Sequence, residues 1–177
     1  NGDTTTSGDL ITSAHLDECL ERAARAIGWG RDPGKNRGLG IACFIKGSPI
    51  STLSEVTVNV NGDGTVEVFS GNGEVGQGLK TLLAQVVGEE LALNPENIRV
   101  VNGDSSTTPY DDGAYGSRST VCTGNAAMKA AQDIREQLLK IAGHILERPE
   151  SDLYVRDGKI FSKSAEGGLP FAQIAKY

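Results

Sequence analysis

The residues best suited to chemistry lie in one glycine-rich segment, Gly71-Asn72-Gly73-Glu74-Val75-Gly76-Gln77-Gly78. It stands between a run typical of a β-strand and a run typical of a helix. A glycine-rich turn that opens a helix lets backbone N–H groups approach an anion, with the positive end of the helix dipole behind them. The segment therefore predicts a site for a phosphate-bearing ligand.

A second segment of this kind, Gly116-Ser117-Arg118-Ser119-Thr120, precedes a long helical pattern. It offers hydroxyl donors, backbone donors and a fork-shaped cation around one point. The alternative is an arginine paired with Asp104, Asp111 or Asp112, and the chemistry alone weighs the two interpretations about equally. Two helix N-termini joined by one long polar loop can converge on one elongated ligand, which is a stronger pattern than either segment alone.

Two further interpretations concern the first segment. The amide of Gln77 can donate and accept hydrogen bonds, which suits a heterocycle edge or a phosphate oxygen, although a solvated helix cap is the simpler role. The spacing Gly71-x-Gly73-x-x-Gly76 also fits the dinucleotide-binding fingerprint, with Asp104 as the ribose-binding acid. The preceding strand, however, alternates in polarity and belongs to a hairpin, so a structural glycine turn is favoured over a Rossmann site.

Hydrophobic spacing and turn residues predict the elements around these segments. The expected elements, in order, are a helix from the N-cap Ser13 to the stop at Gly28, a strand over 39–45, a hairpin of 52–60 and 65–70 across Asn61-Gly62-Asp63-Gly64, a helix from Leu79 to Leu91 terminated by Asn94-Pro95, a strand over 98–101, a long loop over 102–115, a helix capped by Ser119 or Thr120 and ending before Pro149, a hairpin over 153–161 across Asp157-Gly158, and a helix starting near Pro170. The fold class is α+β, an antiparallel or mixed β-sheet packed with long amphipathic helices.

Composition narrows the function classes. The chain has 177 residues, 38% of them hydrophobic, and a net charge of −6, which argues against nucleic acid or an anionic membrane surface as a partner. No apolar run approaches the roughly 20 residues of a membrane span and no signal peptide is evident, so a cytoplasmic location is expected.

Cys19, Cys43 and Cys122 form no C-x-x-C pair and are expected to be buried free thiols, and no residues are assigned as metal ligands. A start without methionine and an end inside a helical pattern predict a piece of a longer polypeptide.

Several ordered motifs together resemble a known family. They are Lys35-Asn36-Arg37-Gly38-Leu39-Gly40, Gly73-Glu74-Val75-Gly76-Gln77-Gly78, Thr81, Ala84-Gln85, Glu89-Glu90-Leu91, Ile98-Arg99-Val100, Gly103-Asp104, Thr107-Thr108-Pro109-Tyr110-Asp111 and Tyr115-Gly116-Ser117-Arg118-Ser119-Thr120. Over about 35–144 the chain closely resembles the molybdopterin-binding large subunit of the xanthine dehydrogenase and aldehyde oxidase family of molybdenum hydroxylases.

The resemblance implies a cofactor site. Residues 14–177 would form part of a molybdopterin-binding domain, preceded by a polar connecting arm over 1–13. The cofactor-binding residues it implies are Val75, Gly76, Gln77 and Gly78 on one side, and Gly116, Ser117, Arg118, Ser119 and Thr120 on the other. No catalytic residue is expected in this chain, since the family's catalytic glutamate lies in a later glycine-rich motif; Glu74 belongs to the binding turn.

The resemblance also implies an activity and partners. Family members hydroxylate a carbon of a purine, N-heterocycle or aldehyde with a water-derived oxygen. The expected cofactor is molybdenum–molybdopterin, with or without an added nucleotide, and iron–sulfur clusters and FAD are expected on other domains or subunits. The fragment alone is predicted to be inactive. The alternatives are a non-catalytic α+β interaction or assembly module and, less favoured, a nicotinamide-dinucleotide-binding domain.

Overall fold

The computed structural model describes the chain except for residues 1, 7, 45 and 47–51. It divides into two compact units, residues 1–46 and residues 47–177.

The N-terminal unit contains one helix, α1 (Leu16–Ile27). The predicted cap at Ser13 is wrong: the helix begins after His15, and no side chain caps its first turn. The predicted stop is confirmed, because Gly28 adopts the left-handed conformation with φ 72° that ends helices. No residue of α1 is buried.

The strand predicted over 39–45 is not formed at 39–44, and Ile45 lies outside the described residues. Strand geometry depends on hydrogen bonds to a neighbouring strand, and within the described part of the N-terminal unit no named strand is present to pair with this segment. Leu39 and Phe44 are exposed there.

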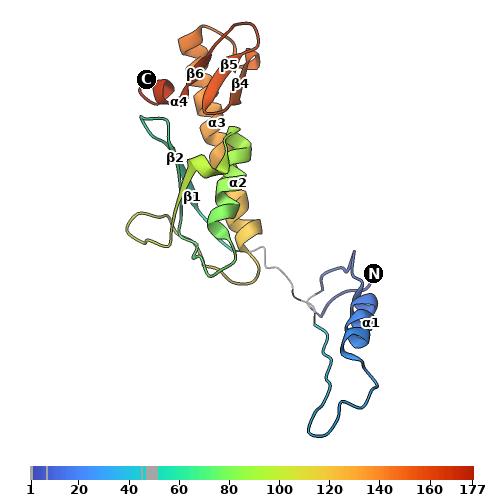
Figure 1. The fold of residues 1–177 in the computed structure, drawn as a ribbon. Coiled ribbons are helices and arrows are strands. Elements are labelled where there is room, and N and C mark those ends of the chain that lie inside the picture. Colours follow the sequence, from blue (N-terminus) through green and yellow to red (C-terminus); the bar gives the residue numbers. More distant parts are fainter. Residues whose placement is uncertain (1, 7, 45, 47–51) are drawn as a thin grey trace. The chain divides into compact units, whose positions relative to one another are not determined.

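The second unit is built on a three-stranded sheet with the order β1-β2-β3 (Figure 1). The predicted hairpin is confirmed: β1 (Val56–Val60) pairs antiparallel with β2 (Val66–Ser70) across the Asn-Gly-Asp-Gly turn. Gly64 in this turn has φ 87°, a conformation that glycine adopts without strain. Val66 and Val68 are buried while Glu67 between them is half-buried, as the alternation of valines with polar residues predicts. The same alternation of faces continues with a half-buried Phe69 and a buried Ser70.

The third strand, β3 (Ile98–Asn102), runs parallel to β2 and is reached through α2 (Leu79–Leu91). The sheet is therefore mixed, and β2 lies both in an antiparallel hairpin and in a β-α-β unit. The hairpin alone does not exclude a dinucleotide fold, since the glycine turn does connect a parallel strand to its crossover helix. The three-stranded mixed sheet nevertheless lacks the extended parallel sheet of a doubly wound fold.

The longest element is α3 (Gly124–Leu146), which continues from a π-helical turn over Ser119–Thr123. Helix α3 packs against α2 and β1, and α2 packs against β3, so the two helices lie against the sheet (Figure 1). The small residues Ala127, Ala131 and Ala142 of α3 are buried in the core, where they permit close helix packing. The predicted helix end before Pro149 is confirmed, but no side chain caps the start at Ser119.

The C-terminal part adds a second, antiparallel sheet of β4 (Leu153–Arg156), β5 (Lys159–Ser162) and β6 (Gly168–Pro170), followed by the short helix α4 (Phe171–Ile174). The predicted hairpin across Asp157-Gly158 is confirmed, and so is a helix after Pro170. Two short 3-10 turns, Pro95–Asn97 and Glu150–Asp152, lead into β3 and β4. One apolar cluster joins this sheet through α3 to the rest of the unit. The mixture of helices with small mixed and antiparallel sheets confirms the α+β class.

Two other findings concern sequence expectations. Among the described residues, no helix is long and apolar enough to span a membrane. The cysteines are free, but the prediction that they are buried is wrong: Cys19 and Cys43 are exposed and Cys122 is half-buried. Cys19 lies on a helix that has no buried residue, and Cys43 lies in the segment that forms no strand.

Candidate functional site

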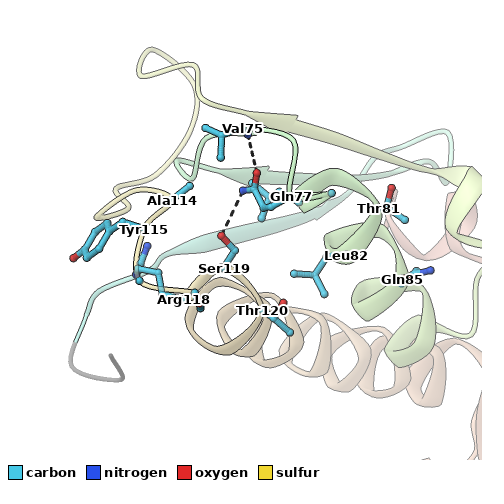
Figure 2. Close-up of a pocket in the computed structure, with 14 residues that line it drawn as sticks. Val75, Gln77, Thr81, Leu82, Gln85, Ala114, Tyr115, Arg118, Ser119 and Thr120 are labelled. Atoms are coloured by element: carbon cyan, nitrogen blue, oxygen red, sulfur yellow. Dashed lines mark hydrogen bonds between the residues drawn. The ribbon is translucent and has the colours of Figure 1, made fainter. Parts of the chain in front are cut away.

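A pocket of about 630 Å³ lies where the starts of α2 and α3 meet (Figure 2). Its size falls within the range of small-molecule sites. It brings together the two segments singled out by the sequence, and of the predicted cofactor-binding residues only Gly76 does not line it. The lining residues are Val75, Gln77, Gly78, Leu79, Thr81, Leu82, Gln85, Ala114, Tyr115, Gly116, Ser117, Arg118, Ser119 and Thr120.

The sequence assigned no cofactor-binding residue within α2, although Thr81 and Gln85 belong to the motifs that resemble the family. Thr81, Leu82 and Gln85 line the pocket from the first turns of this helix. Gly78, Leu82 and Gln85 follow one another at intervals of four and three residues, which places them on one helix face. This spacing is visible in the sequence, and it could have identified one face of the helix after the glycine turn as part of the site.

The glycine turn does not present a free anion cradle, and the sequence expectation needs correction here. The carboxylate of Glu74 folds back over the start of α2 and accepts hydrogen bonds from the backbone N–H groups of Gly76 and Gly78 at 3.0 Å and of Lys80 at 3.3 Å. Withdrawal from water raises the pKa of Glu74, but these N–H donors outweigh it and leave the pKa below its ordinary value. The positive end of α2 is thus occupied by the chain's own carboxylate.

Gln77 connects the two sides of the pocket. Its Oε1 accepts from the N–H of Val75 at 2.7 Å, and its Nε2 donates to the carbonyl of Gly73 at 2.8 Å and to Oγ of Ser119 at 3.4 Å (Figure 2). The first two bonds hold the turn closed, and the third reaches the first turn of the helix on the other side. The amide is neither free nor merely solvated.

Arg118 adopts the alternative role that the sequence left open. Its side chain is fully buried and pairs with Asp111 at 2.6 Å. Its remaining N–H groups donate hydrogen bonds to the carbonyls of Gly113 and Leu53 and to the hydroxyls of Thr52 and Ser54. All five donors are thereby occupied, so the guanidinium shapes the pocket wall from behind.

The charge of Arg118 is retained despite burial. Desolvation lowers the pKa of the guanidinium, but its hydrogen bond and attraction to Asp111 outweigh this, and the net shift is upward. The buried pair ties the strand-like segment before β1 to the loop that carries Asp111, because Leu53 and Ser54 bind the same guanidinium. The geometry of the second segment therefore depends on a buried ionic network.

The backbone of the second segment is tightly bent. Gly116 and Ser117 are both left-handed, with φ 62° and 61°, and the following π-helical turn over Ser119–Thr123 widens the start of α3. A left-handed serine is strained, and both strain and π-turns are frequent at functional sites. This bend turns the residues Gly116 to Thr120 along the pocket rather than away from it.

Asn72 and Gly71 support the pocket through contacts with distant segments, a role that the sequence did not predict for either residue. Asn72 is fully buried, and its Nδ2 donates to Oγ1 of Thr123 at 2.8 Å and to Oγ of Ser119 at 3.3 Å. At Gly71 a Cβ atom would lie 2.2 Å from the carbonyl oxygen of Pro109, so only glycine allows the long loop to cross the turn. Both contacts join segments far apart in the sequence, which local patterns do not reveal.

The donor set of the pocket fits a polar heterocycle or a phosphate. Within the described residues, the side chains of Thr81, Gln85, Ser117 and Thr120 line the pocket without a hydrogen-bond partner. Hydroxyl and amide groups recognise ring nitrogens, carbonyls and phosphate oxygens alike. No group of three or more His, Cys, Asp and Glu side chains in the described part of the chain is placed to hold a metal ion. The hydroxyl and amide groups that line the pocket fit a bound group with ring or phosphate acceptors.

The fold and the pocket define an α+β cofactor-binding unit. Residues 12–177 match the family model of the molybdopterin cofactor-binding domain. The chain therefore belongs to this family, whose members here include xanthine dehydrogenase-like and carbon monoxide dehydrogenase-like molybdenum hydroxylases.

Known proteins support this assignment along nearly the whole chain. The gamma subunit of the 6-hydroxypseudooxynicotine dehydrogenase complex of Paenarthrobacter nicotinovorans is 34% identical over 94% of this chain and 20% of its own length. A probable hypoxanthine oxidase of Escherichia coli strain K12 is 29% identical over 98% of this chain and 19% of its own. The crystal structure of quinoline 2-oxidoreductase from Pseudomonas putida 86 superposes with a TM-score of 0.70 at 25% identity, over 98% of this chain and 25% of that one. The chain spans about a fifth of the length of the curated relatives.

Proposed function

We propose that this pocket holds the pterin of a molybdenum hydroxylase, with Val75, Gln77 and Gly78 on one side and residues 116–120 on the other. Gly76 contributes through the shape of the turn. The observation that carries the proposal is the single pocket formed by two segments that are joined directly by the Gln77–Ser119 hydrogen bond. We propose further that residues 14–177 form part of a larger cofactor-binding domain, preceded by the polar arm over 1–13.

The chain's own residues would act on this ligand by binding and orientation. Thr81, Gln85, Ser117 and Thr120 would supply hydrogen bonds along its edge, because their polar groups line the pocket without partners in the described structure. Leu79 and Leu82 would face its apolar surface. Arg118 would keep the second segment in place through Asp111 rather than touch the ligand. When bound, a molybdenum–pterin group would supply the redox centre for hydroxylation with a water-derived oxygen.

A second cavity of about 360 Å³ lies beside α2. It is lined by Thr81 and Gln85, which also line the first pocket, and by Pro95 and Val100. The residues shared by the two cavities support a pterin that carries an added nucleotide. Separating the cofactor from the purified parent enzyme and determining its mass distinguishes the two forms.

The activity of the whole protein is a proposal drawn from its relatives. Their names describe a hypoxanthine oxidase, a 6-hydroxypseudooxynicotine dehydrogenase and carbon monoxide dehydrogenases. We propose that the parent enzyme hydroxylates a purine, another N-heterocycle or an aldehyde in the cytoplasm, with iron–sulfur and flavin groups on other domains or subunits. The 177-residue chain alone is expected to be inactive, and turnover of any such substrate by the isolated chain would contradict this.

The test of the site uses the full-length parent enzyme. The Gln77→Ala, Ser119→Ala double variant is expected to lose most of its molybdenum and pterin, measured by metal analysis and pterin fluorescence, because it removes the link between the two sides. Gln132→Ala is the matched control, since Gln132 of α3 donates to Glu90 of α2 at 3.0 Å but lies outside the pocket. Normal molybdenum content in the double variant would overturn the site assignment.

One observation favours a non-catalytic assembly module as the second candidate. The carboxylate of Glu74 already accepts from the N–H groups at the start of α2, and Asp111 already pairs with the guanidinium of Arg118. An anion could have used either of these two donor groups. A parent protein that contains neither molybdenum nor pterin when it is purified from cells that make the cofactor would establish this alternative.

A further inference from the structure

The pocket contains one hydroxyl group whose direction of donation is fixed by its surroundings. Oγ of Ser119 accepts hydrogen bonds from Nδ2 of Asn72 at 3.3 Å and from Nε2 of Gln77 at 3.4 Å. A serine oxygen has two lone pairs and one hydrogen. With both lone pairs used, the remaining hydrogen of Ser119 must donate elsewhere, and no described residue accepts it.

The direction of the Asn72 amide follows from the buried ion pair. The carboxylate of Asp111, paired with Arg118, can only accept, and the hydroxyl of Thr123 donates to it at 3.3 Å. Oγ of Ser54, which lies 3.1 Å from Oγ1 of Thr123, then donates to Thr123. Thr123 must then accept from Asn72, which places the NH2 group of the amide toward both hydroxyls at 2.8 and 3.3 Å. The other amide atom, Oδ1, is buried and has no partner among the described residues, as expected if the amide is held as a donor.

We infer that Asn72 is a positioning residue that makes Ser119 an obligate hydrogen-bond donor toward the pocket. The inference rests on the proposed function, and it assigns the chemistry of one point of the site: the ligand atom beside Ser119 is an acceptor, such as a carbonyl or phosphate oxygen or an unprotonated ring nitrogen.

The experiment is a double-variant cycle in the full-length holoenzyme. Ser119→Ala removes the donor, and Asn72→Ala releases the hydroxyl so that it can rotate. The readout is the rate at which molybdenum is lost in mild urea, with the melting temperature of the cofactor-free protein measured separately. Each single variant is expected to lose molybdenum about tenfold faster, since one hydrogen bond to the ligand is lost or weakened. If Asn72 acts through Ser119, the double variant loses molybdenum no faster than Ser119→Ala alone.

Asn102→Ala is the matched control. Asn102 donates to the backbone carbonyl of Asn72 at 3.2 Å, so its removal disturbs the same turn without touching Ser119. Its effect is expected to appear mainly in the melting temperature and to add to that of Ser119→Ala. A cycle in which Asn72→Ala and Ser119→Ala are also additive would overturn the inference.

A second variant keeps the test valid if Asn72→Ala folds poorly. Asn72→Asp preserves the size of the side chain, but an ionised carboxylate only accepts, so Ser119 would turn its hydrogen away from the pocket. Loss of molybdenum at least as fast as in Ser119→Ala is expected, whereas retention at the wild-type rate would contradict the inference. If Ser119→Ala and the Gln77 double variant both retain molybdenum normally, the site assignment fails together with it; if only Asn72→Ala and Asn72→Asp are without effect, the inference alone fails.

Discussion

The guanidinium of Arg118 and the carboxylate of Asp111 form a 2.6 Å ion pair in which both side chains are completely buried. Through Leu53, Ser54 and Thr123, this pair connects the segment before β1 with the start of the helix that borders the pocket. Removing one partner of such a pair leaves a buried charge without compensation, which costs far more than the pair itself contributes.

Replacement of Arg118 by methionine is therefore expected to destabilise the fold by about 3–5 kcal/mol. Urea unfolding of the parent enzyme, or of residues 47–177 if they fold alone, provides the measurement. Arg99→Ala is the control, because Arg99 pairs with Glu67 at the surface with 75% of its side chain exposed. Its loss is expected to cost less than about 1 kcal/mol. Equal effects of the two substitutions would contradict the structural role of the buried pair.

The crossing of the long loop over the glycine turn leads to a second prediction. Gly71→Ala would place a methyl group against the backbone of Pro109, which cannot move without displacing the loop that carries Asp111. A loss of about 1–3 kcal/mol or more is expected, seen as a lower melting temperature. Gly73→Ala is matched to it, since Gly73 has open space around its Cβ position and no positive φ. A Gly71→Ala protein as stable as the Gly73→Ala protein would contradict the close crossing.

Relief of the backbone strain at Ser117 is expected to change the stability of the fold and the retention of the cofactor in opposite directions. Its φ of 61° suits glycine better than serine, so Ser117→Gly is expected to raise stability by about 0.5–1 kcal/mol. Ala92→Gly at φ 48° is the matched control, because Ala92 ends α2 away from the pocket. Both substitutions should stabilise, yet only Ser117→Gly should weaken cofactor retention, since it also removes a hydroxyl from the pocket. Equal cofactor retention in the two variants would show that the Ser117 hydroxyl is not used.

The sequence predicted well those elements that are determined by local pattern. Alternating valines and the Asn-Gly-Asp-Gly turn predict the β1–β2 hairpin, and the leucine spacing predicts α2, although the helix ends at a left-handed Ala92 before the predicted terminator Asn94-Pro95. The predicted strand is not formed at 39–44, because strand formation depends on a neighbouring strand, which periodicity does not supply.

The location of the candidate site could be predicted from local residue types, but the hydrogen-bond partners within it could not. Both helix-opening segments carry recognisable residue types, but the sequence does not tell which acidic residue accepts hydrogen bonds from which donor group. Glu74 caps α2, and Asp111 rather than Asp104 or Asp112 pairs with Arg118. The carboxylate of Asp104 instead accepts from its own neighbour, Ser106. These choices are made by tertiary packing, as the close approach of Pro109 to Gly71 illustrates.

The capping carboxylate of Glu74 makes the order of the glycine turn dependent on pH. Desolvation opposes the shift, but the N–H donors at the start of α2 keep the pKa of Glu74 below its ordinary value in the folded protein. A group with a depressed folded pKa contributes stability that is fully present above its unfolded pKa and is lost as the pH falls through the folded pKa. Amide hydrogen exchange at Gly76, Gly78 and Lys80, corrected for intrinsic rates, is therefore expected to show less protection as the pH is lowered through this range. In Glu74→Gln the same amides should be less protected at neutral pH, and their protection should no longer vary with acid. Unchanged acid dependence in Glu74→Gln would assign the effect to another group, whereas its disappearance would identify Glu74 as the residue that holds the turn.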